Sequence, residues 1–152
     1  AVLKRSEDKI KLINPGFQIT YRITKLDPVK GDIFKVDVTC LKGDQLSKQI
    51  EAGEEFTVCD EFDRYKTKTF LPGEYSAKPL QTLAMENGKR CDTRYTLLEK
   101  KEYYNSNLAH FSPSERRLIN PHFYKVDISD DLYNLKMSII DRLAQEIKAF
   151  RI

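Results

Sequence analysis

Residues 112–129 read SPSERRLINPHFYKVDIS, and this stretch decides how the second half of the chain folds. Its first four residues, 112–115, combine a serine cap, a proline at the favoured first helical position and a glutamate two residues after it, so they predict a helix start. That helix must be short, because Pro121 disfavours helical backbone at the residue before it. Residues 123–129 then alternate apolar and polar side chains, which indicates an extended segment whose packing side chains are Phe123 or Tyr124, Val126 and Ile128.

A long amphipathic run follows the extended segment. Ser129 is suited to cap a helix there, and Asp130 and Asp131 suit the positive end of its dipole. Apolar side chains recur at helical spacing on one stripe: Leu132, Leu135, Ile139, Leu143, Ile147 and Phe150. The stripe predicts a core or interface contact. A membrane-surface helix is the less favoured alternative, because the polar face mixes acidic with basic residues.

The first half of the chain alternates in the manner of β-strands. Residues 17–24, FQITYRIT, and residues 33–40, IFKVDVTC, each place every second side chain on one apolar face. The short loop between them predicts a hairpin. The side chains expected to share its buried face are Phe17, Ile19, Tyr21 and Ile23 on the first strand, and Phe34, Val36, Val38 and Cys40 on the second.

Further short strands are expected within residues 53–62, with Phe56 and Val58 inward, and within residues 65–70, with lysine and threonine outward. Asn87-Gly88 is a strong hairpin pattern, because a type I′ turn needs positive φ at both central residues. Leu80 to Met85 should therefore pair with Lys89 to Cys91. Beyond Cys91 the apolar spacing becomes helical, with Leu97, Leu98, Lys101, Tyr104 and Leu108 in sequence.

Composition predicts a soluble domain of the α+β class. The chain has 152 residues, of which 40% are hydrophobic and 32% charged, enough to bury a core. We expect an antiparallel β-rich N-terminal half, residues 1–92, followed by a helical C-terminal half, residues 93–152, which fold together as one domain. The first residues, AVLKRSEDK, resemble neither a signal nor a transit peptide. They suggest a processed chain or a piece of a longer one.

Charge and hydropathy exclude two classes of partner. The formal net charge is +3, and lysine and arginine alternate with acidic residues, so a nucleic-acid-binding surface is not indicated. No apolar run approaches the length needed to span a bilayer, so no membrane partner is expected.

Cysteine and histidine do not form a metal-binding pattern. Cys40, Cys59 and Cys91 are far apart and make no C-x-x-C pair, so they suggest small buried side chains in a reducing compartment. His110 and His122 favour surface or helix-cap positions. A catalytic pairing of His122 with Asp127 or Cys91 is conceivable, although nothing in the sequence places them together.

Other charged clusters have ordinary interpretations. Asp60, Glu61 and Asp63 could bind a cation or act as an acid–base pair, but a solvated loop between two strands is favoured. Arg116 and Arg117 could bind an anion, although such pairs more often cover a helix surface. No phosphate-binding glycine loop and no nucleophile elbow occurs. The residues alone therefore predict no catalytic residue, no metal ligand and no identified substrate-binding residue.

Three segments in order resemble the C-terminal part of nicotinate phosphoribosyltransferase, and the resemblance covers nearly the whole chain. In residues 6–22, the matching positions are Ser6, Glu7, Lys11, Pro15, Gly16, Tyr21 and Arg22. Phe17 and Gln18 depart from the family there, which usually has basic residues after Pro-Gly. In residues 75–91, the matching positions are Ala77, Lys78, Pro79, Leu80, Gly88 and Lys89. The most specific match is residues 108–143, with Ser-Pro-x-x-x-Arg-Leu, then Asn-Pro-x-x-Tyr-x-Val-x-Ile-Ser, then a terminal Leu-x-x-Leu helix.

The resemblance implies a part of a cytoplasmic transferase and ligase of NAD (pyridine nucleotide) biosynthesis. That family makes nicotinate mononucleotide from nicotinate and phosphoribosyl pyrophosphate, coupled to ATP and Mg through a phosphohistidine. Its catalytic motifs belong to the N-terminal part and the barrel, and none is found here, so neither His110 nor His122 is assigned the phosphohistidine role. The implied partners are the barrel and N-terminal part, with a possible homodimer.

Two other interpretations remain open at this point. The chain could be a stand-alone binding or structural module derived from that domain, without an enzyme attached. It could also derive from the sister enzyme that uses nicotinamide, although residues 120–129, NPHFYKVDIS, fit the nicotinate enzyme better.

Overall fold

The computed structural model describes residues 13–26, 33–91, 95–124 and 126–149. The chain divides into two compact units. Unit 1 comprises residues 1–80 and 126–152, and unit 2 comprises residues 81–125. The division by composition into residues 1–92 and 93–152 stays a prediction.

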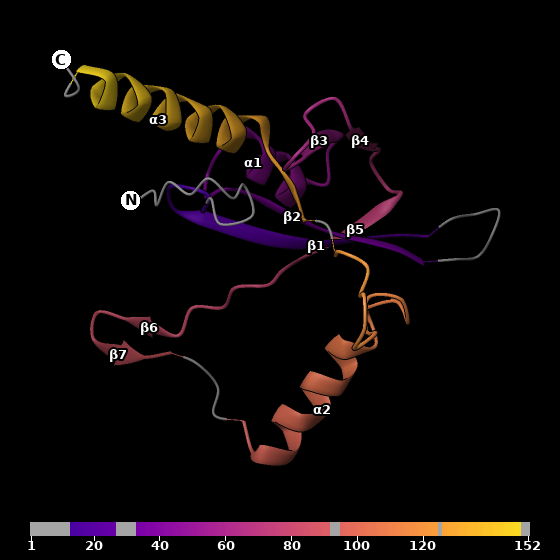
Figure 1. Cartoon of the computed structure of the whole chain (residues 1–152). Coiled ribbons are helices and arrows are strands. Elements are labelled where there is room, and N and C mark those ends of the chain that lie inside the picture. The colour runs from indigo at the N-terminus through magenta and orange to yellow at the C-terminus, as the bar shows by residue number, and fades with distance from the viewer. Residues whose placement is uncertain (1–12, 27–32, 92–94, 125, 150–152) are drawn as a thin grey trace. The chain divides into compact units, whose positions relative to one another are not determined.

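Unit 1 is built on a mostly antiparallel sheet, which among the described residues has six strands in the order β4-β3-β8-β2-β1-β5 (Figure 1). In chain order the strands are β1 Gln18–Leu26, β2 Ile33–Leu41, β3 Phe56–Asp60, β4 Thr67–Phe70, β5 Tyr75–Pro79 and β8 Val126–Ile128. Helices α1 Gln45–Ala52 and α3 Asp130–Ala149 belong to the same unit. The predicted α+β class is confirmed: most of the sheet comes first, and the longer helices follow.

The first two strands form the predicted hairpin, since β1 pairs antiparallel with β2 over the full length of both. The buried face carries the expected side chains Tyr21, Ile23, Val36, Val38 and Cys40, with Ile19 partly buried beside them. The prediction for Phe17 is wrong, because its side chain is 88% exposed. Phe17 precedes β1 and contributes only its backbone oxygen, which accepts a hydrogen bond from the Lys42 N–H. The side chain of Phe34 lies outside the described part.

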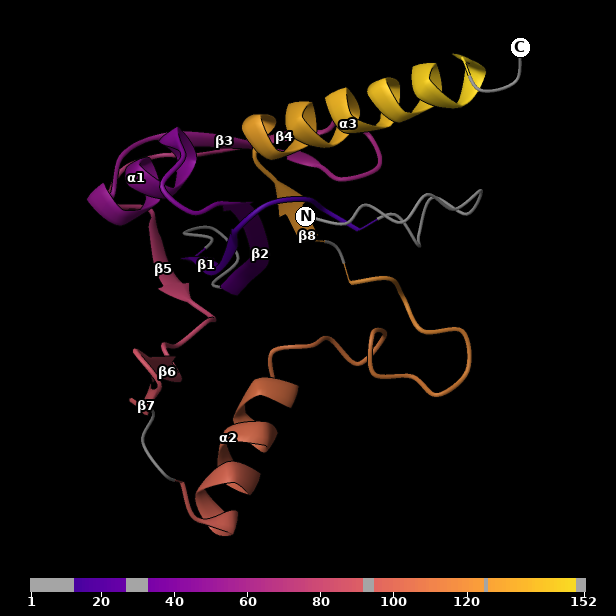
Figure 2. The same cartoon turned by 90° about the vertical axis from the view of Figure 1, so that its left-hand side faces the viewer.

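Strand β8 lies in the middle of the sheet although it comes from the far end of the chain (Figure 2). It runs parallel to β2, with Val126 opposite Asp37, and antiparallel to β3, with Ile128 opposite Cys59. Ile128 is fully buried, as predicted, and Val126 is half-buried. Residues 126–128, near the end of the stretch 112–129, therefore connect the C-terminal part of the chain to the sheet formed by its first half.

Helix α1 covers one face of the sheet and was not anticipated from the sequence. The Asp44 carboxylate caps its start by accepting a hydrogen bond from the Ser47 N–H, and Gly53 ends it with a left-handed φ of 71°. Leu46 and Ile50 point from α1 into the main core. They fill the space above Val36, Val38, Phe56, Val58 and Phe70.

Aromatic side chains join the two edges of the sheet. Phe56 of β3 stacks on Phe70 of β4 with ring centroids 4.9 Å apart, and Tyr75 of β5 meets Phe56 edge-on at 5.0 Å. Because β4 and β5 are the two edge strands, these contacts require the sheet to curl. Phe56 and Val58 point inward, as predicted.

Helix α3 packs on the opposite face of the sheet. Ser129 caps it as predicted, since its hydroxyl accepts a hydrogen bond from the Leu132 N–H, and Asp130 and Asp131 lie in the first turn. Leu132 is fully buried against Cys59 and Ile128. Burial along the stripe then decreases: Leu135, Ile139 and Leu143 are half-buried and Ile147 is 43% exposed, whereas Phe150 lies outside the described residues. In the described ranges, no helix is long and apolar enough to cross a membrane.

Unit 2 contains the predicted hairpin and the predicted helix, but the hairpin is shorter than expected. Only β6 Met85–Glu86 and β7 Lys89–Arg90 pair there, with Cys91 N–H also bonding the Ala84 oxygen. Asn87 and Gly88 have φ of 49° and 75°, as a type I′ turn requires. Helix α2 Leu97–Leu108 starts with a complete capping box between Thr96 and Glu99.

The prediction of a helix that starts at Ser112 is wrong, although the expected capping contacts are present. The Glu115 carboxylate accepts a hydrogen bond from the Ser112 N–H at 2.7 Å, and the Ser112 hydroxyl accepts one from the Glu115 N–H at 3.3 Å. They close a turn that does not continue, and Asn120 takes a left-handed φ of 48° before Pro121. The sequence predicts that Phe123 or Tyr124 packs. The Phe123 side chain is 66% exposed, whereas the Tyr124 ring contacts the Phe111 ring with centroids 4.8 Å apart.

Candidate functional site

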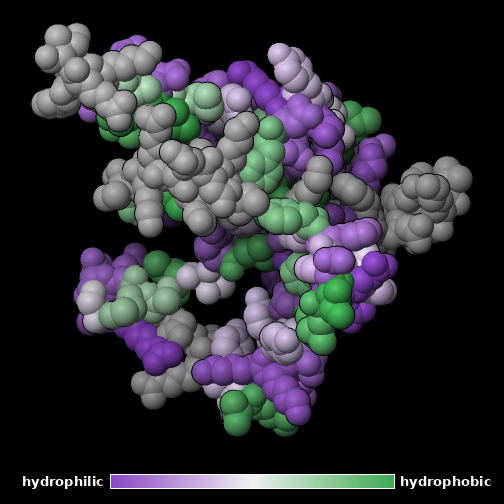
Figure 3. Space-filling model, in the orientation of Figure 1, coloured by the Kyte–Doolittle hydropathy of each residue, from purple (hydrophilic) through white to green (hydrophobic). Residues whose placement is uncertain are grey.

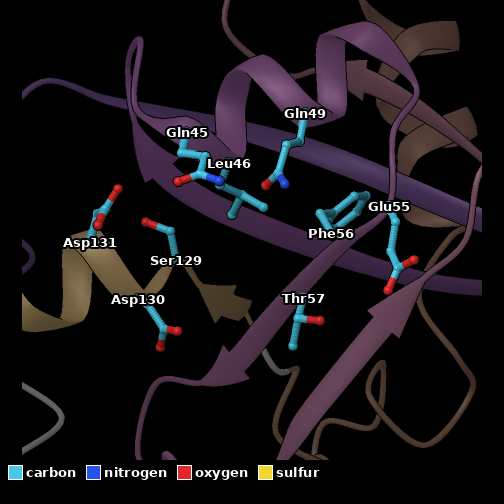
Figure 4. A pocket seen from close by; sticks show the side chains of 9 residues that line it. All are labelled: Gln45, Leu46, Gln49, Glu55, Phe56, Thr57, Ser129, Asp130 and Asp131. Carbon is cyan, nitrogen blue, oxygen red and sulfur yellow. The ribbon is translucent and has the colours of Figure 1, made fainter.

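A cavity of about 530 Å³ lies in unit 1 where α1, the start of β3 and the start of α3 meet (Figure 4). Leu46 and Phe56 are the apolar side chains of its lining. The polar ones are Gln45, Gln49, Glu55, Thr57, Ser129, Asp130 and Asp131. Among these described lining residues no side chain is cationic, so the cavity has an acidic character.

The two helix starts beside this cavity are linked through one carboxylate. Asp44 Oδ1 accepts the Ser47 N–H at 2.7 Å, which caps α1. Asp44 Oδ2 accepts the Leu41 N–H and the Ser129 hydroxyl, each at 3.0 Å. Since Ser129 in turn caps α3, Asp44 fixes the position of both helices relative to β2.

The side chains at the start of α3 cap helices and carry negative charge, which is the opposite of what a phosphate group needs. Phosphate groups are bound by cations and by free backbone N–H groups at helix starts. Here the carboxylates of Asp130 and Asp131 occupy the start of α3, and the Asp44 and Ser129 side chains already satisfy backbone N–H groups. The Ser129 hydroxyl donates to the Asp44 carboxylate and accepts the Leu132 N–H, so both hydrogen bonds serve the caps.

Ion pairs hold charged side chains within the fold. Asp37 accepts two hydrogen bonds from Arg22, each at 2.9 Å. Lys68 Nζ donates a hydrogen bond to Asp127 Oδ2 at 2.5 Å. The prediction that this lysine points outward is therefore wrong. Lys136, only 7% exposed, bonds Glu61 at 3.0 Å. The partners lie 15, 59 and 75 residues apart, so local sequence patterns cannot reveal them.

The acidic cluster spans the last residue of β3 and the loop that follows, and Asp60 is buried rather than solvated as favoured from the sequence. Asp60 Oδ1 accepts the N–H groups of Phe62 and Asp63. Glu61 pairs with Lys136, and Asp63 with Lys66. Each carboxylate thus has a structural partner, and no cluster of three or more metal-ligating side chains occurs in the part of the chain that the structure describes.

The histidines and arginines singled out in the sequence lie in unit 2. His110 and His122 are exposed, as expected of surface residues, and so are Arg116 and Arg117. These arginines lie in the turn after Ser112 and not in a helix. Asp127, by contrast, is a 1% exposed residue of unit 1 paired with Lys68. A catalytic pairing of His122 with Asp127 or Cys91, and anion binding by the arginines, stay predictions.

The cysteines divide into two kinds. Cys40 and Cys59 are buried, as expected, and Cys91 is exposed, contrary to that expectation. Desolvation raises the pKa of Cys40 to about 12 and that of Cys59 to about 11. Both buried thiols therefore stay protonated near neutral pH and are poor nucleophiles.

Unit 2 presents an apolar surface, which sequence reasoning did not anticipate. None of its described residues is buried. Its exposed large apolar side chains are Leu83, Met85, Tyr95, Leu97, Leu98, Tyr103, Tyr104, Leu118, Ile119 and Phe123. Figure 3 shows hydrophobic residues at the surface near the start of α2 and near the loop that follows it, with hydrophilic residues between them. Large exposed apolar patches are a common mark of interaction sites on soluble proteins.

Comparison with known proteins gives a consistent assignment. Residues 18–136 match the family model described as the nicotinate phosphoribosyltransferase C-terminal domain. A nicotinate phosphoribosyltransferase from Bos taurus is 28% identical over 144 residues, which cover 93% of this chain and 24% of that protein. The crystal structure of human nicotinic acid phosphoribosyltransferase superimposes with a TM-score of 0.61 at 20% identity, covering 91% of this chain and 25% of that one. The chain thus spans about a quarter of the relatives it matches.

Proposed function

The chain belongs to the nicotinate phosphoribosyltransferase C-terminal domain family, and from this premise we propose that it serves as the structural C-terminal part of such an enzyme. The observation that carries the proposal is the family match, which extends through unit 2 and into α3. The enzyme would make nicotinate mononucleotide from nicotinate, phosphoribosyl pyrophosphate and ATP, in NAD biosynthesis. The domain itself would supply no catalytic residue.

The chemistry of unit 1 supports a structural role. Phosphoribosyl pyrophosphate carries several negative charges, which enzymes bind with cations, Mg²⁺ and backbone N–H groups. The cavity of unit 1 offers Glu55, Asp130 and Asp131 to such a ligand and would repel it. Its serine is used for helix capping.

The remaining parts of the proposal concern the whole enzyme. ATP and Mg²⁺ would bind to the barrel and N-terminal part rather than to this domain. The partner of this domain would be that remainder of the enzyme, in a cytoplasmic protein that could assemble as a homodimer. In this arrangement the domain supports the catalytic part, and a defect in the domain acts through stability rather than through a lost catalytic group.

Turnover by the purified chain tests the proposal. The chain is mixed with nicotinate, phosphoribosyl pyrophosphate, ATP and Mg²⁺, and nicotinate mononucleotide is measured by chromatography. We expect no product above the protein-free control, while the bovine relative, assayed in parallel, provides the positive control. Product formed by the purified chain above the protein-free control would show that the active site lies in this domain.

A second candidate is a stand-alone binding or structural module derived from this domain. The observation that favours it is the core of unit 1, which is buried by the unit's own residues on both faces of the sheet. The intact mass of the natural product separates the two candidates, because a stand-alone module predicts a mass near 17.7 kDa.

A further inference from the structure

We propose that α2 and residues 118–123 form one docking surface, and that the remainder of the same enzyme covers it. The inference rests on the proposed function and adds the location of the contact. We call this surface the docking face. It is defined by Leu97, Leu98, Tyr103 and Tyr104 on α2, and by Leu118 and Ile119 in the loop after it.

The first argument is the stability of α2. Leu97 is 86% exposed, Leu98 66%, and Tyr103 and Tyr104 62% each, and the helix buries no residue. An isolated helix of about 12 residues is marginal in water, because helix nucleation is costly and most helical stability in proteins comes from packing. The Thr96–Glu99 capping box contributes about 1 kcal/mol, which does not replace a packed face. A partner that buries these side chains would supply the missing stability.

The second argument is that local contacts hold the loop after α2 in one conformation, although its surface is apolar. Leu118 is 101% exposed and Ile119 80%. The loop is held by the Ser112–Glu115 turn and by the Phe111–Tyr124 ring contact. Hydrogen bonds within the loop thus pair Ser112 with Glu115, whereas Leu118 and Ile119 stay exposed, as in a segment that a partner surface covers.

The third argument concerns the identity of the partner. The docking face lies inside the matched family domain, and this domain makes up about a quarter of the relatives, so most of the enzyme lies outside it. Arg116 and Arg117 are exposed directly before Leu118. The partner surface should therefore be apolar at its centre and acidic at the edge that meets these arginines. A second copy of this chain is the competing occupant.

The experiment compares hydrogen exchange in the isolated chain and in the natural enzyme that contains it. Peptides covering 97–108 and 117–124 should exchange at least about tenfold more slowly in the whole enzyme, because burial prevents local opening. Equal exchange in both samples would overturn the proposal. Slow exchange already in the isolated chain would also overturn it, since the docking face would then be covered by the chain itself.

A matched pair of variants separates docking from helix stability. Leu97→Asp with Leu98→Asp removes apolar contact but places acids in the first helical turn, where the favourable dipole interaction offsets the lower helix propensity of aspartate. In the whole enzyme this variant should return peptide 117–124 to the exchange rate of the isolated chain. Ser106→Ala, on the other side of α2, is the control and should leave that rate unchanged. No difference between the two variants would contradict the docking face.

Sedimentation of the isolated chain tests the competing occupant. The wild-type chain and the Leu97→Asp/Leu98→Asp variant should sediment alike. A wild-type dimer that becomes monomeric in the variant would assign the face to a second copy and contradict the proposal. Failure of the proposed function is separate: it would appear as a natural product no larger than this chain, or as turnover by the purified chain.

Discussion

Units 1 and 2 solve the problem of apolar burial in opposite ways. Unit 1 encloses its own side chains, with Ile23, Val38, Ile128 and Leu132 at 0% exposure. Unit 2 has a capped helix and a well-formed turn, but none of its described residues is buried. Local hydrogen bonding is therefore present in both, and only unit 1 adds a core. The difference teaches that good local chemistry makes an element, whereas burial decides whether it is stable without a partner.

The largest expected effect comes from one large-to-small change in each unit. Phe56→Ala removes a 2% exposed ring that contacts Phe70 and Tyr75, and should cost roughly 3–5 kcal/mol of unfolding free energy. Leu118→Ala, at a fully exposed site, should change the unfolding free energy of the isolated chain by less than about 0.5 kcal/mol. Urea unfolding of the isolated chain measures both. Similar costs for the two variants would remove the contrast between the units.

The next effect concerns helix caps. Asp44→Ala removes the bonds to Ser47 N–H, Leu41 N–H and the Ser129 hydroxyl, and should cost about 2 kcal/mol of global stability. Thr96→Ala, the equivalent change in unit 2, should raise hydrogen exchange only in α2. Asp44→Asn, which retains capping ability, is the control and should cost less than the alanine. A purely local effect of Asp44→Ala would argue against a linked pair of caps.

A smaller effect should appear at alkaline pH and only in unit 1. Desolvation raises the pKa of Cys40 to about 12 and of Cys59 to about 11, from an ordinary value of 9.0. The folded state thus favours the protonated thiols, so their stabilising contribution is complete below the ordinary pKa and is lost as the pH rises through the folded values. Burial also raises the pKa of Tyr21, which acts in the same direction at higher pH.

Urea unfolding at about pH 8 and about pH 11 measures this loss. A Cys40→Ala/Cys59→Ala variant is the matched control and should lose less stability between the two pH values. A thiol reagent at neutral pH should modify the exposed Cys91 and spare the other two. Rapid modification of Cys40 or Cys59 would show that the core of unit 1 opens readily.

The smallest effect is local to α2 at acidic pH. Hydrogen bonds from the Thr96 N–H and hydroxyl lower the pKa of Glu99 below its ordinary 4.5. A lowered folded pKa means that the stabilisation is present above the ordinary value and is lost as the pH falls through the folded value. Exchange of the α2 amides should therefore accelerate on acidification relative to Glu99→Gln, which does not titrate. Parallel behaviour of the two proteins would show that the charge of Glu99 contributes nothing to the stability of α2.

Local patterns predicted the elements well where alternation or a cap was strong. The β1–β2 hairpin, the Asn87-Gly88 turn and the Ser129 cap all follow from residues close in sequence. Helix α1 was missed because it is short, although Asp44 before it and Gly53 after it could have indicated its ends. The helix expected after Ser112 failed because a capping box alone does not supply a buried face.

What depends on distant residues could not be predicted in this way. The insertion of β8 between β2 and β3 brings Ile128 beside Cys59, which no local pattern encodes. The cavity likewise combines residues near 45, 55 and 130, and its acidic character appears only after folding. The family resemblance could be recognised from short motifs, such as Ser-Pro-x-x-x-Arg-Leu and Asn-Pro-x-x-Tyr-x-Val-x-Ile-Ser, which are read along the sequence without knowledge of these contacts.

The intact mass of the natural product is the most direct test of the central claim that this domain serves a larger catalyst. The protein is recovered from its source and identified by peptides of residues 95–124. Native mass spectrometry of the undigested protein then gives its mass. The account predicts a single polypeptide well above the 17.7 kDa of this chain. A natural product of 17.7 kDa, stable and with unit 2 still exposed, would contradict it.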